Sequence, residues 1–440
     1  MERKTHTKGE NLLLINPWIY DFAAYDLWAK PLGLLALAAL LKENGWSIHC
    51  IDCLDVHHPA LKRLRPQGTK RRPDHRGHFY REEVGKPAPL APIPRRFYRF
   101  GLSPEVFSEV LQPLPIPQAV LVTSGMTYWY RGVHEVIGIV KEAFPSVPVI
   151  LGGIYATLCT EHAERTSGAD VVIQGWGEVQ ILKLLEELTG VAPFFIPDLN
   201  DLDTFPSPAF GLYPHLDYYC ILTSRGCPFH CTYCASPLLN PRFIRRDPAR
   251  VVNEIAAWAD RGVEDIAFYD DALLADREFA IALLQGIEKR GSRVRFHAPN
   301  GLHARGVTEE MAHLMRRVGF ATVRLGLETC SHERQMATGG KVSNDDVKSA
   351  VQYLRGAGYG SEEIGVYILA GLPRQERGEV AESIRFVKEC GARPYLAEYS
   401  PLPGTPLWGE AVKVSPFDLQ GEPLFHNNTI LPCRWEGLGW

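Results

Sequence analysis

The sequence lacks the features that mark exported and membrane-spanning proteins. Its start, residues 1–10, is polar, and the apolar run at 12–15 is shorter than the core of a signal peptide. The longest apolar stretch, at 31–41, falls short of the roughly 20 residues that cross a bilayer. We therefore expect a cytoplasmic protein in a reducing compartment, with no membrane segment.

An excess of charge of one sign is also missing, and cysteine is scarce. Lys and Arg number 47 against 51 Asp and Glu, a net charge of −4, so overall charge does not point to nucleic acid. Ten cysteines in 440 residues are too few for a disulfide scaffold. Three of them nevertheless lie within one short segment, and this cluster is the one unusual feature of the composition.

Residues 11–56 alternate between strand and helix patterns. The apolar run at 11–17 predicts a buried strand, and the segment 31–45 places strong helix formers between an initial Pro and a final Gly. A second strand follows at 46–52, which makes a βαβ unit, and the same alternation returns at 119–190. The two stretches predict an α/β domain with one doubly wound parallel sheet of the Rossmann type. Ligands of such sheets bind beyond the carboxyl ends of the strands.

Residues 57–101 interrupt this domain. They hold 12 lysines and arginines against three acidic residues, together with seven prolines, and show no sustained periodicity. We interpret them as a basic surface insertion. Its charge could contact a nucleic acid, a phosphorylated substrate or an acidic electron donor. A solvated loop whose arginines pair with acidic groups is the interpretation that we favour, so we do not expect a nucleic-acid partner.

A second region of βα alternation follows a linker rich in Pro and Asp at 192–213. Six consecutive strand–helix steps predict a partial (βα)6 barrel. We expect the first domain to span 1–191, the barrel domain 214–410 and a C-terminal tail 411–440. The predicted strands are 218–223, 265–269, 294–297, 322–327, 364–369 and 395–399, and the predicted helices lie near 248–261, 276–290, 308–318, 344–357 and 377–390.

The cysteine cluster lies in a loop directly after the first barrel strand. Cys227, Cys231 and Cys234 have the spacing C-x3-C-x2-C, which lets three thiolates surround one compact iron–sulfur cluster. Three ligands on a four-iron cluster leave one iron open to a substrate or cofactor. Zinc is the alternative, but a closed zinc site needs four ligands, and His230 is poorly placed inside the loop. Thiols that bind no metal are a further alternative.

This spacing, with the aromatic Tyr233 before the third cysteine, resembles the radical SAM superfamily over about residues 215–410. The resemblance implies that Cys227, Cys231 and Cys234 hold a 4Fe-4S cluster whose open iron chelates S-adenosylmethionine. One-electron reduction then cleaves this cofactor to methionine and a 5′-deoxyadenosyl radical. A reducing partner such as flavodoxin or ferredoxin is implied as well.

Other strand ends resemble the S-adenosylmethionine subsites of that family. Asp270 and Asp271 follow the second barrel strand, where many members carry a Gly-Gly-Glu run instead. Glu328 ends the fourth strand, close to the expected ribose, and Gly371 belongs to the motif of the fifth strand, which passes the adenine. With Tyr233, these are the expected cofactor-binding residues of the barrel. Ordinary strand-end turns are the alternative for each of them.

The N-terminal sheet resembles the cobalamin-binding domain of one large branch of that superfamily, over about residues 11–190. Small residues at the strand ends would let a corrinoid ring approach the backbone. The Asp-x-His-x-x-Gly motif that supplies an axial histidine in other cobalamin proteins is missing. We therefore expect an open or non-histidine lower face, with an empty domain as the alternative. The implied cobalamin-binding residues are Asn16, Ser124, Gly152, Gly153, Gly175 and Gly177.

These resemblances predict an enzyme that cleaves S-adenosylmethionine reductively to start radical chemistry on an unknown substrate. Methylation of an unactivated carbon or phosphorus centre is common in the cobalamin branch. Ring-forming or rearranging chemistry without cobalamin, and a non-catalytic iron–sulfur or corrinoid carrier, are the alternatives. The lone C-x2-C pair, Cys50 and Cys53, and the five scattered cysteines are expected to be structural.

Overall fold

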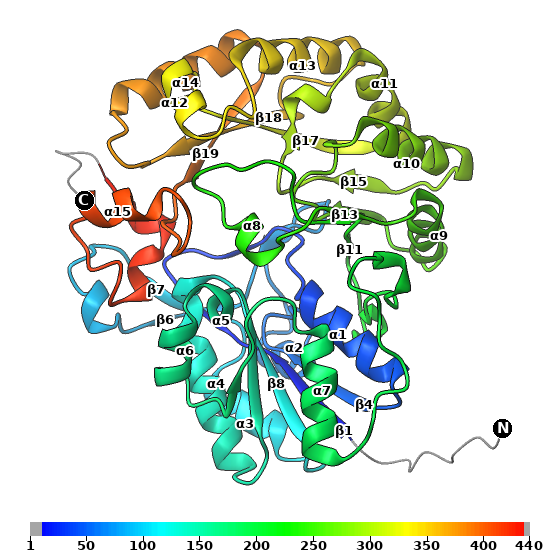
Figure 1. Cartoon of the computed structure of the whole chain (residues 1–440), viewed down its shortest axis with the longest axis vertical. Helices are drawn as coiled ribbons and strands as arrows, with labels where there is room; N and C mark the ends of the chain where they lie inside the picture. The colour runs from blue at the N-terminus through cyan, green and yellow to red at the C-terminus, as the bar shows by residue number, and fades with distance from the viewer. Residues whose placement is uncertain (1–10, 435–440) are drawn as a thin grey trace. The chain divides into compact units, whose positions relative to one another are not determined.

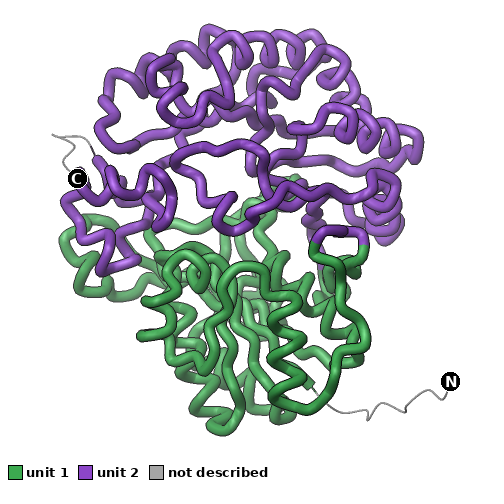
Figure 2. The backbone as a smooth tube through the Cα atoms, viewed as in Figure 1, with its two compact units in different colours: residues 1–199, 204–215 green, residues 200–203, 216–440 purple. Residues whose placement is uncertain are grey.

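The computed structural model describes residues 11–434, which form two compact units (Figure 2). Unit 1 contains the chain up to 199 together with 204–215, and unit 2 contains 200–203 and the chain from 216 onward. The chain thus passes between the units in the region of the predicted linker. Among the described residues, no helix is both long enough and apolar enough to span a membrane.

Unit 1 is built on a five-stranded parallel sheet in the order β10-β9-β8-β1-β4. In β1, Leu13 and Ile15 pack into the core on one face of the sheet, and Leu12 and Leu14 pack into the core on the other. A strand that is apolar on both faces needs helices on both faces, so the predicted doubly wound fold is confirmed (Figure 1). The elements are β1 (Asn11–Asn16), α1 (Leu32–Glu43), β4 (Ser47–Asp52), β8 (Ala119–Ser124), α4 (Tyr130–Ala143), β9 (Val149–Gly153), β10 (Val171–Val172) and α7 (Glu178–Thr189).

The basic insertion at 57–101 has regular structure that its sequence pattern does not reveal. It contains α2 (Pro59–Leu64), and its strands β6 (Arg81–Val84) and β7 (Phe97–Phe100) join β2 (Ile19–Asp21) in an antiparallel sheet. Strands this short are too brief to show the alternation that predicts them. Aromatic side chains anchor the insertion in the core of unit 1, namely Phe79, Tyr80, Phe97 and Phe100.

Part of the positive charge of the insertion is paired within unit 1. The guanidinium of Arg71 lies 2.7 Å from the carboxylate of the buried Asp26. The guanidinium of Arg81 lies 4.6 Å from the centre of the Tyr98 ring. The Arg71–Asp26 pair agrees with the interpretation that arginines of the insertion pair with acidic groups elsewhere in the domain.

Unit 2 is a partial barrel of parallel strands in the order β11-β14-β15-β17-β18-β19, with β16 paired to β17. All six predicted strands and all five predicted helices are present within a few residues of their predicted bounds. The elements are β11 (Tyr219–Ile221), α9 (Pro248–Ala259), β14 (Asp265–Phe268), α10 (Arg277–Arg290), β15 (Arg295–His297), β16 (Leu302–His303), α11 (Glu309–Val318), β17 (Phe320–Glu328), α13 (Asn344–Gly356), β18 (Ile364–Ala370), α14 (Arg377–Glu389) and β19 (Arg393–Glu398).

Three further α-helices in the described part of unit 2 were not predicted, and the first is α8 (Ser236–Leu239). Helix α12 (His332–Ala337) lies between β17 and α13, and α15 (Trp408–Val414) follows the last strand. The segment after β19 packs a small core of its own against the end of β18, with members that include Leu372, Tyr399 and Leu419. The part of the predicted tail from 435 to Trp440 lies outside the described residues.

Two histidines flank a buried tyrosine on the α4 side of unit 1. The hydroxyl of Tyr155, in α5 (Ile154–Leu158), lies 3.0 Å from His134 Nε2 and 2.7 Å from His162 Nδ1. Burial, reinforced by the neighbouring His162 and Arg131, lowers the pKa of His134 to about 4. His134 is therefore neutral in the folded protein at neutral pH.

We predict that this histidine makes unit 1 less stable in mild acid. Below pH ~6.5 the unfolded chain protonates His134 but the folded chain does not, so acid favours unfolding. The loss should begin near pH 6.5, grow to about 2–3 kcal/mol and level off below pH 4. His134→Gln, which does not titrate, should flatten this part of the profile, as measured by urea unfolding with hydrogen-exchange mass spectrometry of α4 and α5. The exposed His313→Gln is the control, and an unchanged slope in His134→Gln would contradict the prediction.

Candidate active site

The three clustered cysteines line one cavity of about 320 Å³ in unit 2. They lie in the loop between β12 (Ser224–Arg225) and α8 (Ser236–Leu239). The other walls of the cavity come from β17, β18 and β19 and from the chain that follows β14, β15 and β17. The lining includes Tyr233, Asp271, His303, Glu328 and Lys341.

Remote segments of unit 2 fix the path of the cysteine loop. The amide of Thr232 donates to the carbonyl of Thr338 (3.2 Å), and the amide of Leu407 donates to the carbonyl of Thr232 (3.0 Å). Gly339, at φ +116°, packs so closely that a Cβ atom there would lie 3.2 Å from the Cα atom of Cys231. A side chain at 339 would push the loop away, so this position requires glycine.

The donor set suits an iron–sulfur cluster better than zinc. A single zinc ion with Zn–S bonds of about 2.3 Å brings its ligands within roughly 4 Å of each other. Within residues 11–434, the sulfurs of Cys227, Cys231 and Cys234 do not all lie within 4.8 Å of one another. His230 is exposed and does not line the cavity. Three separated thiols around one cavity fit a larger cluster with one iron left open.

Tyr233, Asp271 and Glu328 share the cavity with the cysteines, but two other predicted residues do not. Asp270 is buried and does not line the cavity. Its carboxylate accepts hydrogen bonds from the backbone amides and the hydroxyls of Thr223 and Ser224. It therefore shapes the end of the first barrel strand. Gly371 lies at the end of β18 but does not line the cavity, and its role at the adenine stays a prediction.

Two lining residues of the cavity form an ion pair that the sequence did not predict. The ammonium of Lys341 lies 2.6 Å from Glu328 Oε1. Burial by itself would lower the pKa of Lys341, but the carboxylate of Glu328 outweighs it and raises this pKa above the ordinary value. Lys341 was not among the predicted site residues, because only the fold brings this lysine back to Glu328.

His303 is a second cavity residue that the sequence did not indicate. Its ring stacks on Phe229 of the cysteine loop, with centres 4.2 Å apart and planes 26° apart. Burial, together with the cation of Lys341, lowers the pKa of His303 to about 3. The cavity therefore contains a neutral imidazole at physiological pH.

The strand ends of unit 1 bring together several of the predicted cobalamin-binding residues. The hydroxyl of Ser124 donates to the carbonyl of Gly152 (2.6 Å) and accepts from the amide of Ala156 (3.3 Å). Gly153, at φ +99°, permits this packing, because its Cβ atom would lie 2.3 Å from the carbonyl oxygen of Ser124. A Cβ atom at Gly152 or Gly175 would meet nothing within 4 Å. This open space beside backbone fits the close approach of a flat ring.

The end of β1 carries a closed polar network. The side-chain amide of Asn16 donates to Asp52 Oδ1 (2.7 Å), and the hydroxyl of Tyr213 donates to Asp52 Oδ2 (2.6 Å). The ammonium of Lys30 lies 3.2 Å from Asp55 and 3.9 Å from Asp52. No histidine follows β1 here, so an open or non-histidine lower face for cobalamin stays our prediction.

The C-x2-C pair at the end of β4 has the character of structural thiols. Cys50 and Cys53 are both free in the structure. Burial raises the pKa of Cys50 to about 12 and that of Cys53 well above its ordinary value. Thiols that stay protonated at neutral pH are poor nucleophiles.

Two family models match the chain. Residues 221–387 match the Radical SAM superfamily, and residues 115–185 match the B12 binding domain. The first match contains the cysteine loop and most of the barrel, and the second contains β8 to α7, including the glycine-lined strand ends.

Relatives and a solved structure extend the similarity over most of the chain. An uncharacterized methyltransferase from Pyrococcus horikoshii is 26% identical over 355 residues, 72% of each chain. The cytidylyl-2-hydroxyethylphosphonate methyltransferase of Streptomyces wedmorensis is 22% identical over 97% of this chain and 87% of its own. The radical S-adenosylmethionine methyltransferase TsrM of Kitasatospora setae, solved with cobalamin and a 4Fe-4S cluster bound, has a TM-score of 0.67. It covers 93% of this chain and 78% of its own at 17% identity, which establishes a shared fold.

We predict that Cys231→Ala abolishes the bound cluster while the protein stays folded, because two thiolates cannot hold it. Iron content and visible absorbance after anaerobic reconstitution would measure the loss, and circular dichroism would report the fold. Cys390→Ala, which removes a thiol outside the cavity, is the control. If Cys231→Ala retained about four irons per chain, the ligand assignment would be wrong.

Proposed function

Because this chain is a radical SAM enzyme that carries a B12-binding domain, we propose that it methylates a carbon or phosphorus centre. When bound, the 4Fe-4S cluster supplies the electron that cleaves S-adenosylmethionine to methionine and a 5′-deoxyadenosyl radical, and cobalamin supplies the methyl carrier. The observation that carries the proposal is the presence, in one chain, of a three-cysteine cavity and a glycine-lined sheet edge with open space.

In this proposal, the residues of the cavity bind and orient S-adenosylmethionine. The carboxylate of Glu328 accepts hydrogen bonds from ribose hydroxyls, and its ion pair with Lys341 holds it in place. Asp271 is positioned by the hydroxyl of Ser236, which donates to it at 2.5 Å, and it takes the place of the family's acidic residue that binds the methionine amine. The ring of Tyr233 supplies an apolar wall beside the cysteines.

In unit 1, the proposed cobalamin site lies along the ends of β8, β9 and β10. Gly152 and Gly175 leave room for the ring, and Gly153 keeps the end of β9 tight against Ser124. Asn16 and Gly177 border the same carboxyl edge of the sheet. The relatives include methyltransferases, matched over 72% and 97% of this chain, and cyclases, matched over 66% and 65% of it. We rank methyl transfer first because its matches extend over more of the chain, and ring formation is the second candidate.

The proposed reaction also needs electrons from outside the chain. We infer a reducing protein partner of the flavodoxin or ferredoxin class, and a cytoplasmic location that keeps thiols reduced.

The test of methyl transfer uses S-adenosylmethionine with a trideuterated methyl group. We expect the anaerobically reconstituted enzyme, given a reductant and hydroxocobalamin, to form S-adenosylhomocysteine, to label cobalamin with the deuterated methyl group, and to release 5′-deoxyadenosine. Mass spectrometry would detect all three. If 5′-deoxyadenosine formed without S-adenosylhomocysteine or label, radical chemistry without methyl transfer would be the better assignment. If no product formed, the chain would be a carrier.

For cobalamin, we predict that Gly152→Phe weakens binding about tenfold or more, because the aromatic ring would fill the open space beside the backbone. The absorption spectrum of protein from cells supplied with hydroxocobalamin, and a titration of the purified protein, would measure this. Gly138→Phe on the exposed face of α4, where a side chain also meets no neighbour, is the matched control. Equal binding by Gly152→Phe and wild type would place the cofactor elsewhere.

A further inference from the structure

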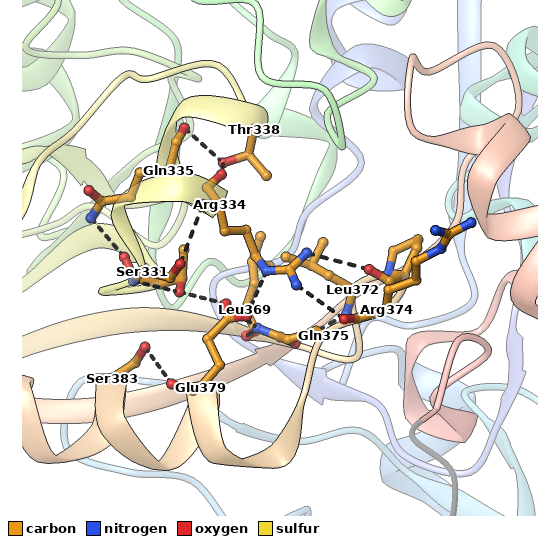
Figure 3. Close-up of polar contacts among 12 residues, drawn as sticks. Ser331, Arg334, Gln335, Thr338, Leu369, Leu372, Arg374, Gln375, Glu379 and Ser383 are labelled. Carbon is orange, nitrogen blue, oxygen red and sulfur yellow. Dashed lines mark hydrogen bonds and ion pairs between the residues drawn. The ribbon is translucent and has the colours of Figure 1, made fainter.

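A polar network outside the cavity joins the chain that leaves β17 to the chain that leaves β18 (Figure 3). Its centre is Glu379 on α14. Oε1 of Glu379 accepts a hydrogen bond from the hydroxyl of the fully buried Thr329 (2.7 Å), and Oε2 accepts from Arg334 Nε (2.8 Å). Thr329 is the residue directly after Glu328. A single carboxylate on α14 thus binds both the end of β17 and the helix α12 that follows it.

The same carboxylate reaches the end of β18 through Gln375, whose side chain is buried. The amide nitrogen of Gln375 donates to Glu379 Oε1 (3.3 Å) and to the carbonyl of Leu369 (3.0 Å). Its amide oxygen accepts from the backbone of Gly371 (2.8 Å) and of Leu372 (3.2 Å). The side chain of Gln375 therefore satisfies the backbone groups of Leu369, Gly371 and Leu372 at the end of β18. Gln375 in turn donates a hydrogen bond to Glu379.

Arg334 and Ser383 strengthen the connection from both sides. The guanidinium of Arg334 donates to the carbonyls of Pro373 (3.4 Å) and Arg374 (3.2 Å) as well as to Glu379. The hydroxyl of Ser383, one turn after Glu379 on α14, accepts from the amide of Cys330 (2.9 Å). The two strand ends are therefore cross-linked at several points by hydrogen bonds, and those made by Glu379 and Arg334 are charge-assisted.

The network lies beside two strained backbone positions. Glu328 has φ +69° and Arg374 has φ +54°, and this left-handed conformation is unfavourable for a residue with a Cβ atom. Glu328 immediately precedes Thr329, and Arg374 immediately precedes Gln375. Strain of this kind persists only where the surroundings hold the chain in place. At Glu328 it turns the side chain into the cavity, where the carboxylate meets Lys341.

We propose that Glu379, which does not line the cavity, is a positioning residue for S-adenosylmethionine: it fixes the ends of β17 and β18 and thereby holds Glu328 in its cofactor-facing conformation. The inference rests on the proposed role of this cavity in binding S-adenosylmethionine. Without Glu379, Thr329, Arg334 and Gln375 would each lose a partner. The binding-competent conformation would then be populated only part of the time, which raises the apparent Kd in proportion.

The test compares three variants of α14 in the reconstituted full-length enzyme. Glu379→Ala removes the carboxylate, and Glu379→Gln keeps an oxygen that accepts from Thr329 but loses the charge opposite Arg334. Glu382→Ala, on the exposed side of the same helix, is the matched control. The readouts are iron content, the Kd for S-adenosylmethionine by equilibrium dialysis, and the KM and kcat for release of 5′-deoxyadenosine.

We expect Glu379→Ala to keep about four irons per chain and to raise the Kd and KM for S-adenosylmethionine about tenfold, with kcat within about threefold of wild type. Saturating cofactor restores the competent conformation, which is why KM changes more than kcat. Glu379→Gln should recover part of the affinity, and Glu382→Ala should match wild type. In the background of Glu328→Gln, the change at Glu379 should add little, because it acts through Glu328.

Three results would overturn the proposal. The first is wild-type affinity in a Glu379→Ala protein that holds four irons. The second is loss of cluster and fold in both Glu379 variants, which would make the network a stability element only. The third is full additivity with Glu328→Gln. Failure of the wild-type protein, with its cluster in place, to bind S-adenosylmethionine would instead refute the proposed function.

Discussion

The carboxyl edge of a parallel sheet is the constraint on which both candidate sites depend. Beyond the strand ends, backbone N–H and C=O groups no longer pair with a neighbouring strand. They must therefore find hydrogen-bond partners in loops, side chains or ligands. In unit 2 this edge carries the cysteine loop, Glu328 and the chain after β15. In unit 1 it carries Ser124 and the glycines at the end of β9.

The cavity in unit 2 places acidic groups and a cation close together. Three thiols and two carboxylates line one cavity, and Lys341 is the cation that lies against Glu328. A buried carboxylate with a close ammonium partner keeps its charge, which a lone buried carboxylate would tend to lose. His303 stays neutral in the same surroundings, so the cavity offers cationic, anionic and neutral polar groups within a small volume.

Most of the architecture was predictable because its elements are long and repeat regularly. The apolar run of β1 and the Pro-to-Gly frame of α1 predicted their bounds to within a few residues, and the six strand–helix steps predicted the barrel. The short strands of the insertion, α12 and α15 were missed, because a few residues carry too little periodicity. The spacing of Cys227, Cys231 and Cys234 was the strongest local signal, since ligands on one short loop are close in space whatever the rest of the chain does.

What the sequence by itself determined is therefore the local part: the βα order, the glycines at the strand ends, and the three cysteines on one loop. Only the tertiary structure decided which strand-end residues enter the cavity. Asp271 enters and its neighbour Asp270 does not, and Lys341 returns to Glu328 after a helix that the pattern did not show. The network around Glu379 joins β17, α12, β18 and α14. Its contacts depend on how separate elements pack, and sequence spacing carries no record of that packing.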